Sequence, residues 1–154
     1  PIMNVLPGAI HACVGVHALA HDQTDSDSQT VTPAETMYVY MDHFNNEDME
    51  ALNEMLEPPF FFLKGTDKGV YPTYEEFVDF QGLRDSGWNY SKIDSTEMIY
   101  EDPKTAMINW VFSRYDKDDN VTATQSVDYL LMNVNGVWKI KGAFTPTDFP
   151  MGQE

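Results

Sequence analysis

Residues 121–140 read VTATQSVDYLLMNVNGVWKI, and this stretch decides the fold. Asn135-Gly136 stands between two runs rich in β-branched and aromatic residues. An Asn-Gly pair in that setting is the strongest short-range signature of a β-hairpin. The stretch therefore predicts two long antiparallel strands, 121–134 and 137–145, joined by a two-residue turn.

Two further segments of the same composition precede this hairpin. They cover residues 88–101 and 105–115, and Glu101-Asp102-Pro103 separates them. The polar run Asp116-Lys117-Asp118-Asp119-Asn120 then leads into residue 121. Clusters of these residue types between apolar runs mark turns. We therefore expect a four-stranded antiparallel meander in the second half of the chain.

The first half has a helical pattern. Thr32-Pro33-Ala34-Glu35 is a capping box with proline at the first helical position, which satisfies backbone amides at a helix start. Apolar side chains then recur at helical spacing, at Met37, Tyr40, Met41 and Phe44. A second short helix begins near Met49 and cannot continue through Pro58-Pro59.

A short aromatic strand and a third helix complete the prediction. Phe60-Phe61-Phe62-Leu63 has the composition of a strand. Thr73-Tyr74-Glu75-Glu76 is a second capping box, and it predicts a helix through Phe77, Phe80 and Leu83 that ends at Gly87. Three N-terminal helices packed on a mainly antiparallel sheet form an α+β fold. We expect an arm and polar linker over 1–31, the domain over 32–148 and a tail over 149–154.

Length and charge limit the function classes. The chain has 154 residues, with 9 Lys and Arg against 25 Asp and Glu, for a formal net charge of −16. One domain of this size builds a full hydrophobic core without metal or disulfide support. Binding to nucleic acid or to an anionic membrane needs clustered positive charge, so neither partner is expected. The single cysteine, Cys13, excludes an intrachain disulfide.

The N-terminal arm leaves the cellular location open. Residues 5–20 are mostly apolar and similar to the core of a secretory signal, with Ala18-Leu19-Ala20 as a candidate cleavage site. No lysine or arginine occurs before Lys64, so the basic region that begins such signals is missing. A packed arm of a cytoplasmic protein and the remnant of a secreted or periplasmic one both fit this pattern.

The order of these elements and two local strings resemble the NTF2-like superfamily, which includes the ketosteroid isomerase and SnoaL-like polyketide cyclase groups. The string from Tyr40 to Leu52 is similar to the superfamily's first helix, polar corner and second helix. Val127-Asp128-Tyr129-Leu130-Leu131 and Asn135-Gly136-Val137-Trp138-Lys139-Ile140 are similar to its final two strands. The resemblance implies a strongly curved sheet that encloses a cone-shaped cavity. The superfamily contains enzymes and non-catalytic members, so the fold alone does not define a function.

The resemblance also implies roles for single residues. Tyr40 falls where ketosteroid isomerases place the tyrosine of the oxyanion hole, and Asp128 falls where they place a protonated aspartic acid. Lys64 occupies the position of the carboxylate base, so steroid isomerisation lacks its proton acceptor. The residues expected to line a ligand pocket are Tyr40, Phe44, Phe62, Trp110 and Ser126.

Asp128 has two interpretations from the residues alone. Strand alternation places its side chain with those of Thr124, Ser126 and Leu130, and we expect Trp110 on the same face. If this face is interior, burial favours the neutral carboxylic acid, which then donates a proton. If it is exterior, Asp128 is one acid among many on the surface. Lys64 and His43 have the same ambiguity between moving a proton and being solvated.

No metal or cofactor is expected. His11, His17 and His21 lack the spacing of a structural zinc site, and no phosphate-binding loop, nucleotide fingerprint or catalytic triad is present. Two hypotheses remain. In the first, the chain is a cofactor-free isomerase, cyclase or hydratase that encloses a small apolar ligand, with Tyr40, Asp128, Lys64 and His43 as acid and base groups. In the second, it is a non-catalytic ligand-binding or dimerisation module with a cavity filled by side chains, paired as a homodimer through its sheet face.

Overall fold

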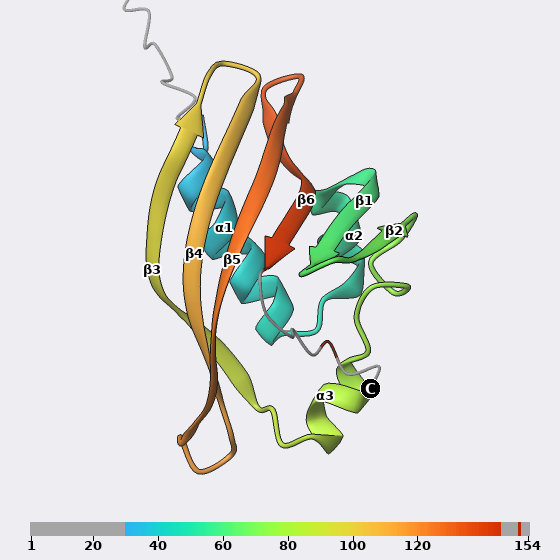
Figure 1. Cartoon of the computed structure of the whole chain (residues 1–154), viewed down its shortest axis with the longest axis vertical. Helices are drawn as coiled ribbons and strands as arrows, with labels where there is room; N and C mark the ends of the chain where they lie inside the picture. Colours follow the sequence, from blue (N-terminus) through green and yellow to red (C-terminus); the bar gives the residue numbers. More distant parts are fainter. Residues whose placement is uncertain (1–29, 146–150, 152–154) are drawn as a thin grey trace, which may run out of the picture.

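The computed structural model describes residues 30–145 and residue 151. Figure 1 shows one curled sheet with helices on one side of it. In chain order the elements are α1 (Pro33–Asn45), α2 (Met49–Met55), β1 (Leu56–Lys64), β2 (Asp67–Tyr71), α3 (Phe80–Asp85), β3 (Tyr90–Glu101), β4 (Thr105–Tyr115), β5 (Val121–Val134) and β6 (Val137–Thr145). The fold is α+β, as the sequence predicts.

The sheet has six strands in the order β2-β1-β6-β5-β4-β3. Strands β3 to β6 form the predicted antiparallel meander, and the turn between β5 and β6 is Asn135-Gly136. Both turn residues have positive φ, 53° and 88°, as a type I′ hairpin requires. Strand β1 runs parallel to β6, and β2 pairs with β1 at the edge of the sheet.

Helix α1 begins with the predicted capping box. The Thr32 side chain accepts from the Glu35 amide, and the Glu35 carboxylate accepts from the Thr32 amide. Its apolar stripe is buried: Met37, Tyr40, Met41 and Phe44. In Figure 1 the helix lies along the sheet behind β3, β4 and β5, and it contacts β3 and β4. The side chains of this stripe therefore point at the inner face of the meander.

The third helix differs from the prediction. It covers only Phe80–Asp85, and its N-cap is Asp79 rather than Thr73. Asn53 of α2 is the cause, because its side chain accepts from the Tyr74 amide at 2.7 Å and donates to Glu75 at 2.8 Å. The expected capping box is consequently a turn tied to α2. Strand β2, which is short and polar, was also not predicted from the sequence.

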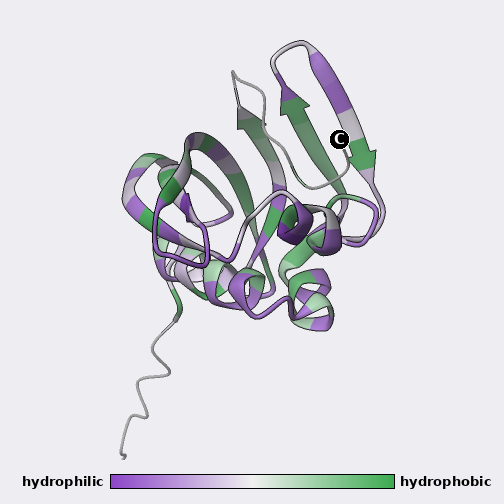
Figure 2. Cartoon of the chain, turned by 90° about the horizontal axis from the view of Figure 1, so that it is seen from below, coloured by the Kyte–Doolittle hydropathy of each residue, from purple (hydrophilic) through white to green (hydrophobic). Residues whose placement is uncertain are grey.

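The two faces of the meander are distinguished by burial. On β4, Ala106, Ile108, Trp110 and Phe112 are buried, and on β5 the buried residues are Val127, Tyr129 and Leu131. Hydrophobic and hydrophilic segments alternate along the ribbon in Figure 2. Across the pair, Trp110 lies opposite Val127 and Asn109 lies opposite Asp128. The prediction that Trp110 and Asp128 share a face is therefore wrong by one position, and a shift of one residue exchanges the faces of a strand.

No helix in the described part of the chain is long and apolar enough to cross a membrane. The apolar arm segment of residues 5–20 lies outside the described residues. Met151 is the only described residue of the predicted tail, and its side chain is buried.

Candidate functional site

Three tyrosine side chains lie together in the interior of the fold. Tyr40 comes from α1, Tyr74 from the turn before α3, and Tyr129 from the inner face of β5. The hydroxyl oxygens of Tyr40 and Tyr74 are 2.5 Å apart, although 34 residues separate them in sequence. The Tyr129 ring lies 5.9 Å from that of Tyr40, and its hydroxyl acts on the pKa of Tyr40. The three phenols form one polar cluster within the hydrophobic core.

Burial keeps these phenols neutral. It raises the pKa of Tyr40 to about 12, against the opposing effects of its hydrogen bonds to Tyr74 and Tyr129. Burial is also the largest cause that raises the pKa values of Tyr74 and Tyr129 well above 10. A neutral phenol is both a hydrogen-bond donor and an acceptor. At physiological pH the cluster therefore presents O–H groups rather than negative charge.

Aromatic rings surround the cluster. The ring of Trp110 lies 4.8 Å from that of Tyr129 and 5.6 Å from that of Tyr40, and Phe44 lies 6.2 Å from Tyr40. Trp110 is only 2% exposed, and its Nε1 has no hydrogen-bond partner in the described part of the chain, although it is close enough to Tyr129 to lower that residue's pKa. A buried donor without a partner costs free energy, so this N–H is an available donor for a bound molecule.

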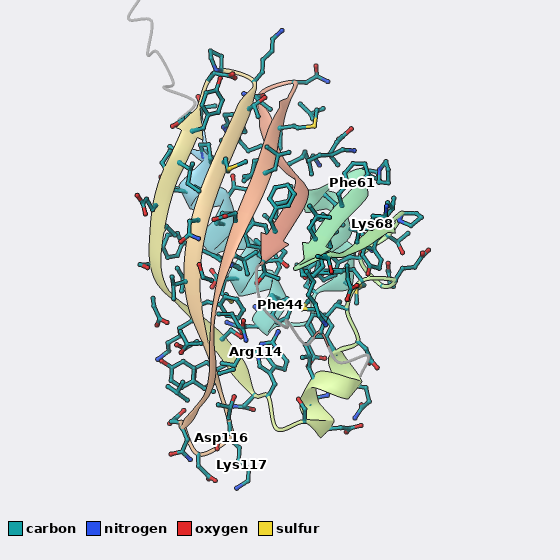
Figure 3. The ribbon with its side chains drawn as sticks, viewed as in Figure 1. Phe44, Phe61, Lys68, Arg114, Asp116 and Lys117 are labelled. Atoms are coloured by element: carbon teal, nitrogen blue, oxygen red, sulfur yellow. The ribbon has the colours of Figure 1, made fainter. Side chains whose placement is uncertain are left out.

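Arg114 adds positive charge to the interior. It lies near the end of β4, is 5% exposed, and lowers the pKa values of all three tyrosines. In Figure 3 the Arg114 side chain lies near Phe44, and both residues line the same small cavity. The Arg114 guanidinium contacts the Met151 sulfur at 3.5 Å. Arg114 is the only positively charged side chain in the described lining of this cavity, and it contacts Met151.

The cavity itself is nearly closed. Its volume is about 10 Å³, which is at most the space of one water molecule. It is lined by Tyr40, Met41, Phe44, Ser91, Trp110, Phe112, Arg114, Tyr129 and Met151. The carbonyl oxygen of Met151 accepts a hydrogen bond from the Asp79 amide at 2.9 Å, which ties the backbone at Met151 to the residue before α3. The described lining contains no carboxylate and no imidazole.

Three of the five expected pocket residues meet at this cavity: Tyr40, Phe44 and Trp110. Phe62 belongs to a neighbouring aromatic cluster, where its ring lies 4.9 Å from that of Phe77. Phe77 in turn lies 5.7 Å from Tyr74, so the two clusters are continuous. Ser126 is exposed on the opposite face of β5.

Asp128 lies outside this interior. It follows Val127 and precedes Tyr129, which are both buried, so its side chain points to the outer face of the sheet. There it accepts a hydrogen bond at 2.7 Å from Asn109, which also donates to Ser126. Tyr40 and Asp128 therefore share no space, and the inward orientation considered for Asp128 is wrong. The sequence alternation was correct, but the polar face is the outer one.

Lys64 and His43 are also separate from the tyrosines. Lys64 ends β1, where it lies opposite Asp67 of β2 and Thr145 of β6, and it does not line the cavity. His43 is half-buried on a different side of α1, with its Nδ1 3.7 Å from an Asp48 carboxylate oxygen. The four proposed acid and base residues thus occupy four different places.

No group of three metal-ligating side chains occurs among the described residues. His11, His17 and His21, which were considered as metal ligands, lie outside the described residues.

The sequence interpretation missed Tyr74, Tyr129, Arg114 and Met151. Tyr129 could have been found, because it alternates with Val127 and Leu131 on an entirely apolar strand face. Tyr74 was assigned to a helix start, which hid its role as a core residue. Arg114 and Met151 have no local pattern that predicts burial, and only the tertiary structure brings them together.

Comparison with known proteins provides a family. A model described as NTF2-like protein (DUF6841) matches residues 34–148. Among solved structures, Aln2 from a Streptomyces species superposes with a TM-score of 0.60 at 15% identity, covering 75% of this chain and 87% of that one. A putative ketosteroid isomerase from Shewanella frigidimarina gives 0.56 at 10% identity, covering 75% and 96%.

The β subunit of benzoate 1,2-dioxygenase from Burkholderia mallei gives a TM-score of 0.54 at 15% identity, covering 76% of this chain and 91% of that one. Likeness at these identities concerns the fold alone. No curated protein matches the chain.

Proposed function

We propose that the interior of this chain, which belongs to the family described as NTF2-like protein (DUF6841), binds a small apolar molecule that carries a carbonyl or phenol oxygen. The cluster of Tyr40, Tyr74 and Tyr129 hydroxyls carries this proposal. The cluster lies among aromatic rings of the core, which are complementary to an apolar ring, and its hydroxyls offer hydrogen bonds to an oxygen that would be costly to bury unpaired.

Hydrogen-bond counting supports an available donor. Each phenol has one O–H, and the bond between Tyr40 and Tyr74 uses one of the three. O–H groups of the cluster therefore remain available, and the Trp110 Nε1–H is a further donor beside them. Two preorganised donors in a desolvated site stabilise partial negative charge on a ligand oxygen. The site is therefore suited to hold and polarise such an oxygen.

The geometry favours binding over acid–base catalysis. An isomerase, cyclase or hydratase needs a group that accepts a proton, and the described cavity lining offers neither carboxylate nor imidazole. Asp128 is on the outer face, His43 is on another side of α1, and Lys64 is at a strand end. A catalytic version of the proposal therefore needs the ligand itself to supply the base.

The ligand takes the place of the Met151 side chain. With Met151 in position the cavity holds about 10 Å³, far below the few hundred Å³ of ordinary ligand pockets. Met151 is unbranched, and its sulfur contacts Arg114, so its departure frees the space between the tyrosines and the arginine. We propose that this opened space is the cone-shaped cavity of the fold.

Calorimetric titration with 2-naphthol, an apolar bicyclic phenol, tests the proposal. We expect Met151→Ala to bind 2-naphthol more tightly than the wild type, because the side chain that fills the site is shortened. In the Met151→Ala background, Tyr74→Phe should weaken binding by roughly fivefold to tenfold, the value of one hydrogen bond. Tyr38→Phe is the matched control, because Tyr38 lies on α1 with Tyr40 and is exposed.

Two results would contradict the proposal. One is the absence of 2-naphthol binding to Met151→Ala at millimolar concentration, provided that circular dichroism shows a folded protein. The other is equal binding by the Tyr74→Phe and Tyr38→Phe variants, which would mean that the ligand does not contact the tyrosine cluster.

A second candidate function is assembly through the outer face of the sheet. Phe61 and Leu63 of β1 are 41% and 39% exposed, and Val70 of β2, opposite Phe61, is 58% exposed. Figure 3 shows Phe61 and Lys68 at this edge of the sheet. Exposed apolar side chains that are adjacent on one face favour burial against a partner. The proposed partner is a second copy of the chain.

Sedimentation velocity tests this assembly. The wild type should sediment as a dimer, and Phe61→Glu should shift it to a monomer without loss of the folded far-ultraviolet spectrum. A Phe61→Glu variant that remains a dimer, or a wild type that is monomeric at about 100 µM, would contradict assembly through this face.

A further inference from the structure

A groove on the surface is much larger than the interior cavity. It has a volume of about 710 Å³, within the range of small-molecule sites. Helices α1 and α2 and the turn between β5 and β6 form its walls. It is lined by Thr30, Val31, Thr36, Val39, His43, Ala51, Glu54, Met55, Gly136, Val137, Trp138 and Lys139.

The apolar part of the groove comes from all three elements. Val39 lies on α1 and is 43% exposed, and Met55 ends α2. Trp138 of β6 is 9% exposed and contributes an aromatic surface. Val137, beside it, is 55% exposed. A molecule with an aromatic or aliphatic body would bury these side chains, at roughly 25 cal/mol per Å² of apolar surface.

The polar part contains Lys139 and Glu54, and neither side chain makes an ion pair among the described residues. Lys139 donates from Nζ to the backbone oxygen of Glu54, which carries no formal charge. The ion pairs within residues 30–145 are His43–Asp48, Arg84–Glu47 and Lys117–Asp118, so none involves Lys139. An ammonium group has three N–H donors, and one is used here. Lys139 therefore retains donors and charge at the edge of the groove.

We infer that this groove binds a small apolar carboxylate, with its body on Trp138, Val39 and Met55 and its carboxylate on Lys139. A half-buried ammonium beside an aromatic surface is complementary to such an ion, because charge-assisted hydrogen bonds are stronger than neutral ones. The groove lies on a different side of α1 from Tyr40, so this site is independent of the proposed interior site.

The net charge of the chain limits the affinity. At −16 the protein repels an anion at long range, and the Glu54 carboxylate of the lining repels it at short range, so only Lys139 and the apolar contacts favour binding. We therefore expect a dissociation constant of about 0.1–1 mM for a simple probe. Contact with Lys139 should distinguish a carboxylate from its neutral amide by roughly fivefold to tenfold.

Titration of the full chain with 3-phenylpropanoate and 3-phenylpropanamide, followed by two-dimensional NMR, tests the inference. We expect saturable shifts of the Val39, Val137 and Trp138 amide signals with both probes, and tighter binding of the carboxylate. Lys139→Gln should remove the preference for the carboxylate while the amide binds as before.

Lys141→Gln is the matched control. Lys141 is also on β6, also donates to a backbone oxygen, that of Glu57 at 3.3 Å, and lies outside the groove lining. It should leave both titrations unchanged. Tyr74→Phe should also leave them unchanged, so failure of the interior site and failure of the groove are separate results.

Three outcomes would overturn the inference. The first is no shift of the groove signals at about 10 mM probe. The second is equal affinity for carboxylate and amide in the wild type. The third is movement of the same signals with protein concentration alone, which would assign the groove to a second copy of the chain.

Discussion

Alkaline unfolding provides the sharpest test of the tyrosine cluster. The pKa of Tyr40 is raised to about 12 in the folded chain, against 10 in the unfolded one. A raised pKa in the folded state means that the folded state holds the proton more tightly. The resulting stability is fully present below pH 10 and is lost as the pH rises from 10 to 12.

The magnitude follows from this shift. At pH 11 the unfolded phenol is ionised and the folded one is still mostly neutral, so ionisation of Tyr40 alone destabilises the fold by about 1 kcal/mol relative to neutral pH. Tyr74 and Tyr129, with pKa values raised well above 10, contribute a loss of stability in the same direction. The wild type should therefore lose more stability between pH 8 and pH 11 than Tyr40 alone accounts for.

Urea unfolding at a series of pH values is the assay, with the wild type compared with Tyr40→Phe and Tyr38→Phe. The alkaline loss in Tyr40→Phe should be smaller by about 1 kcal/mol at pH 11, while Tyr38→Phe should follow the wild type. Comparison between variants removes the effect of Tyr90, whose hydrogen bond to Asp119 raises its pKa to about 12. Identical pH dependence in all three proteins would refute the burial of Tyr40 as a neutral phenol.

Three further predictions concern single positions. Gly136→Ala should lower the free energy of unfolding in urea by about 1 kcal/mol, because φ of Gly136 is +88° in the hairpin turn. An unchanged free energy of unfolding would contradict the type I′ geometry. Asp128→Asn should change the free energy of unfolding by less than about 0.5 kcal/mol, because the side chain is on the outer face. In the Met151→Ala background it should also leave 2-naphthol binding unchanged, and weaker binding would mean that Asp128 contributes to the site. Thr32→Ala should lower the free energy of unfolding by about 1 kcal/mol, because the capping box is lost, and thermal unfolding measures this change. Thr30→Ala is the control, because Thr30 does not cap the helix.

The meander could be predicted from sequence because its information is local. Turn chemistry at Asn135-Gly136 and at residues 116–120 defines where the strands end, and the observed strands β4, β5 and β6 have the predicted limits. The capping box at Thr32 likewise acts within four residues. The second capping box failed because Asn53, 21 residues earlier in the chain, binds the backbone at Tyr74 instead. A tertiary contact there overrides a local preference.

The face of β5 could not be derived from alternation alone. Thr124, Ser126 and Asp128 alternate with Val127, Tyr129 and Leu131, and either set lines the inside according to which face the helices cover. Hydrophobicity favours Val127, Tyr129 and Leu131 as the inner set. The family resemblance favoured the first, because it aligned Asp128 with an acidic group that ketosteroid isomerases hold inside. The desolvation cost of a buried carboxylate explains why the apolar set prevails.

The polarity of this interior therefore consists mainly of neutral groups that donate hydrogen bonds. A buried phenol costs less to desolvate than a carboxylate, and its proton remains bound at any physiological pH. In the proposed binding mode such a site polarises a ligand oxygen and stabilises negative charge there, and the described lining has no carboxylate or imidazole to take a proton away. Any reaction at these tyrosines must begin with a ligand that is already activated, or with a base that the ligand itself provides. Binding is the function that we propose for the described residues, because it needs no such help.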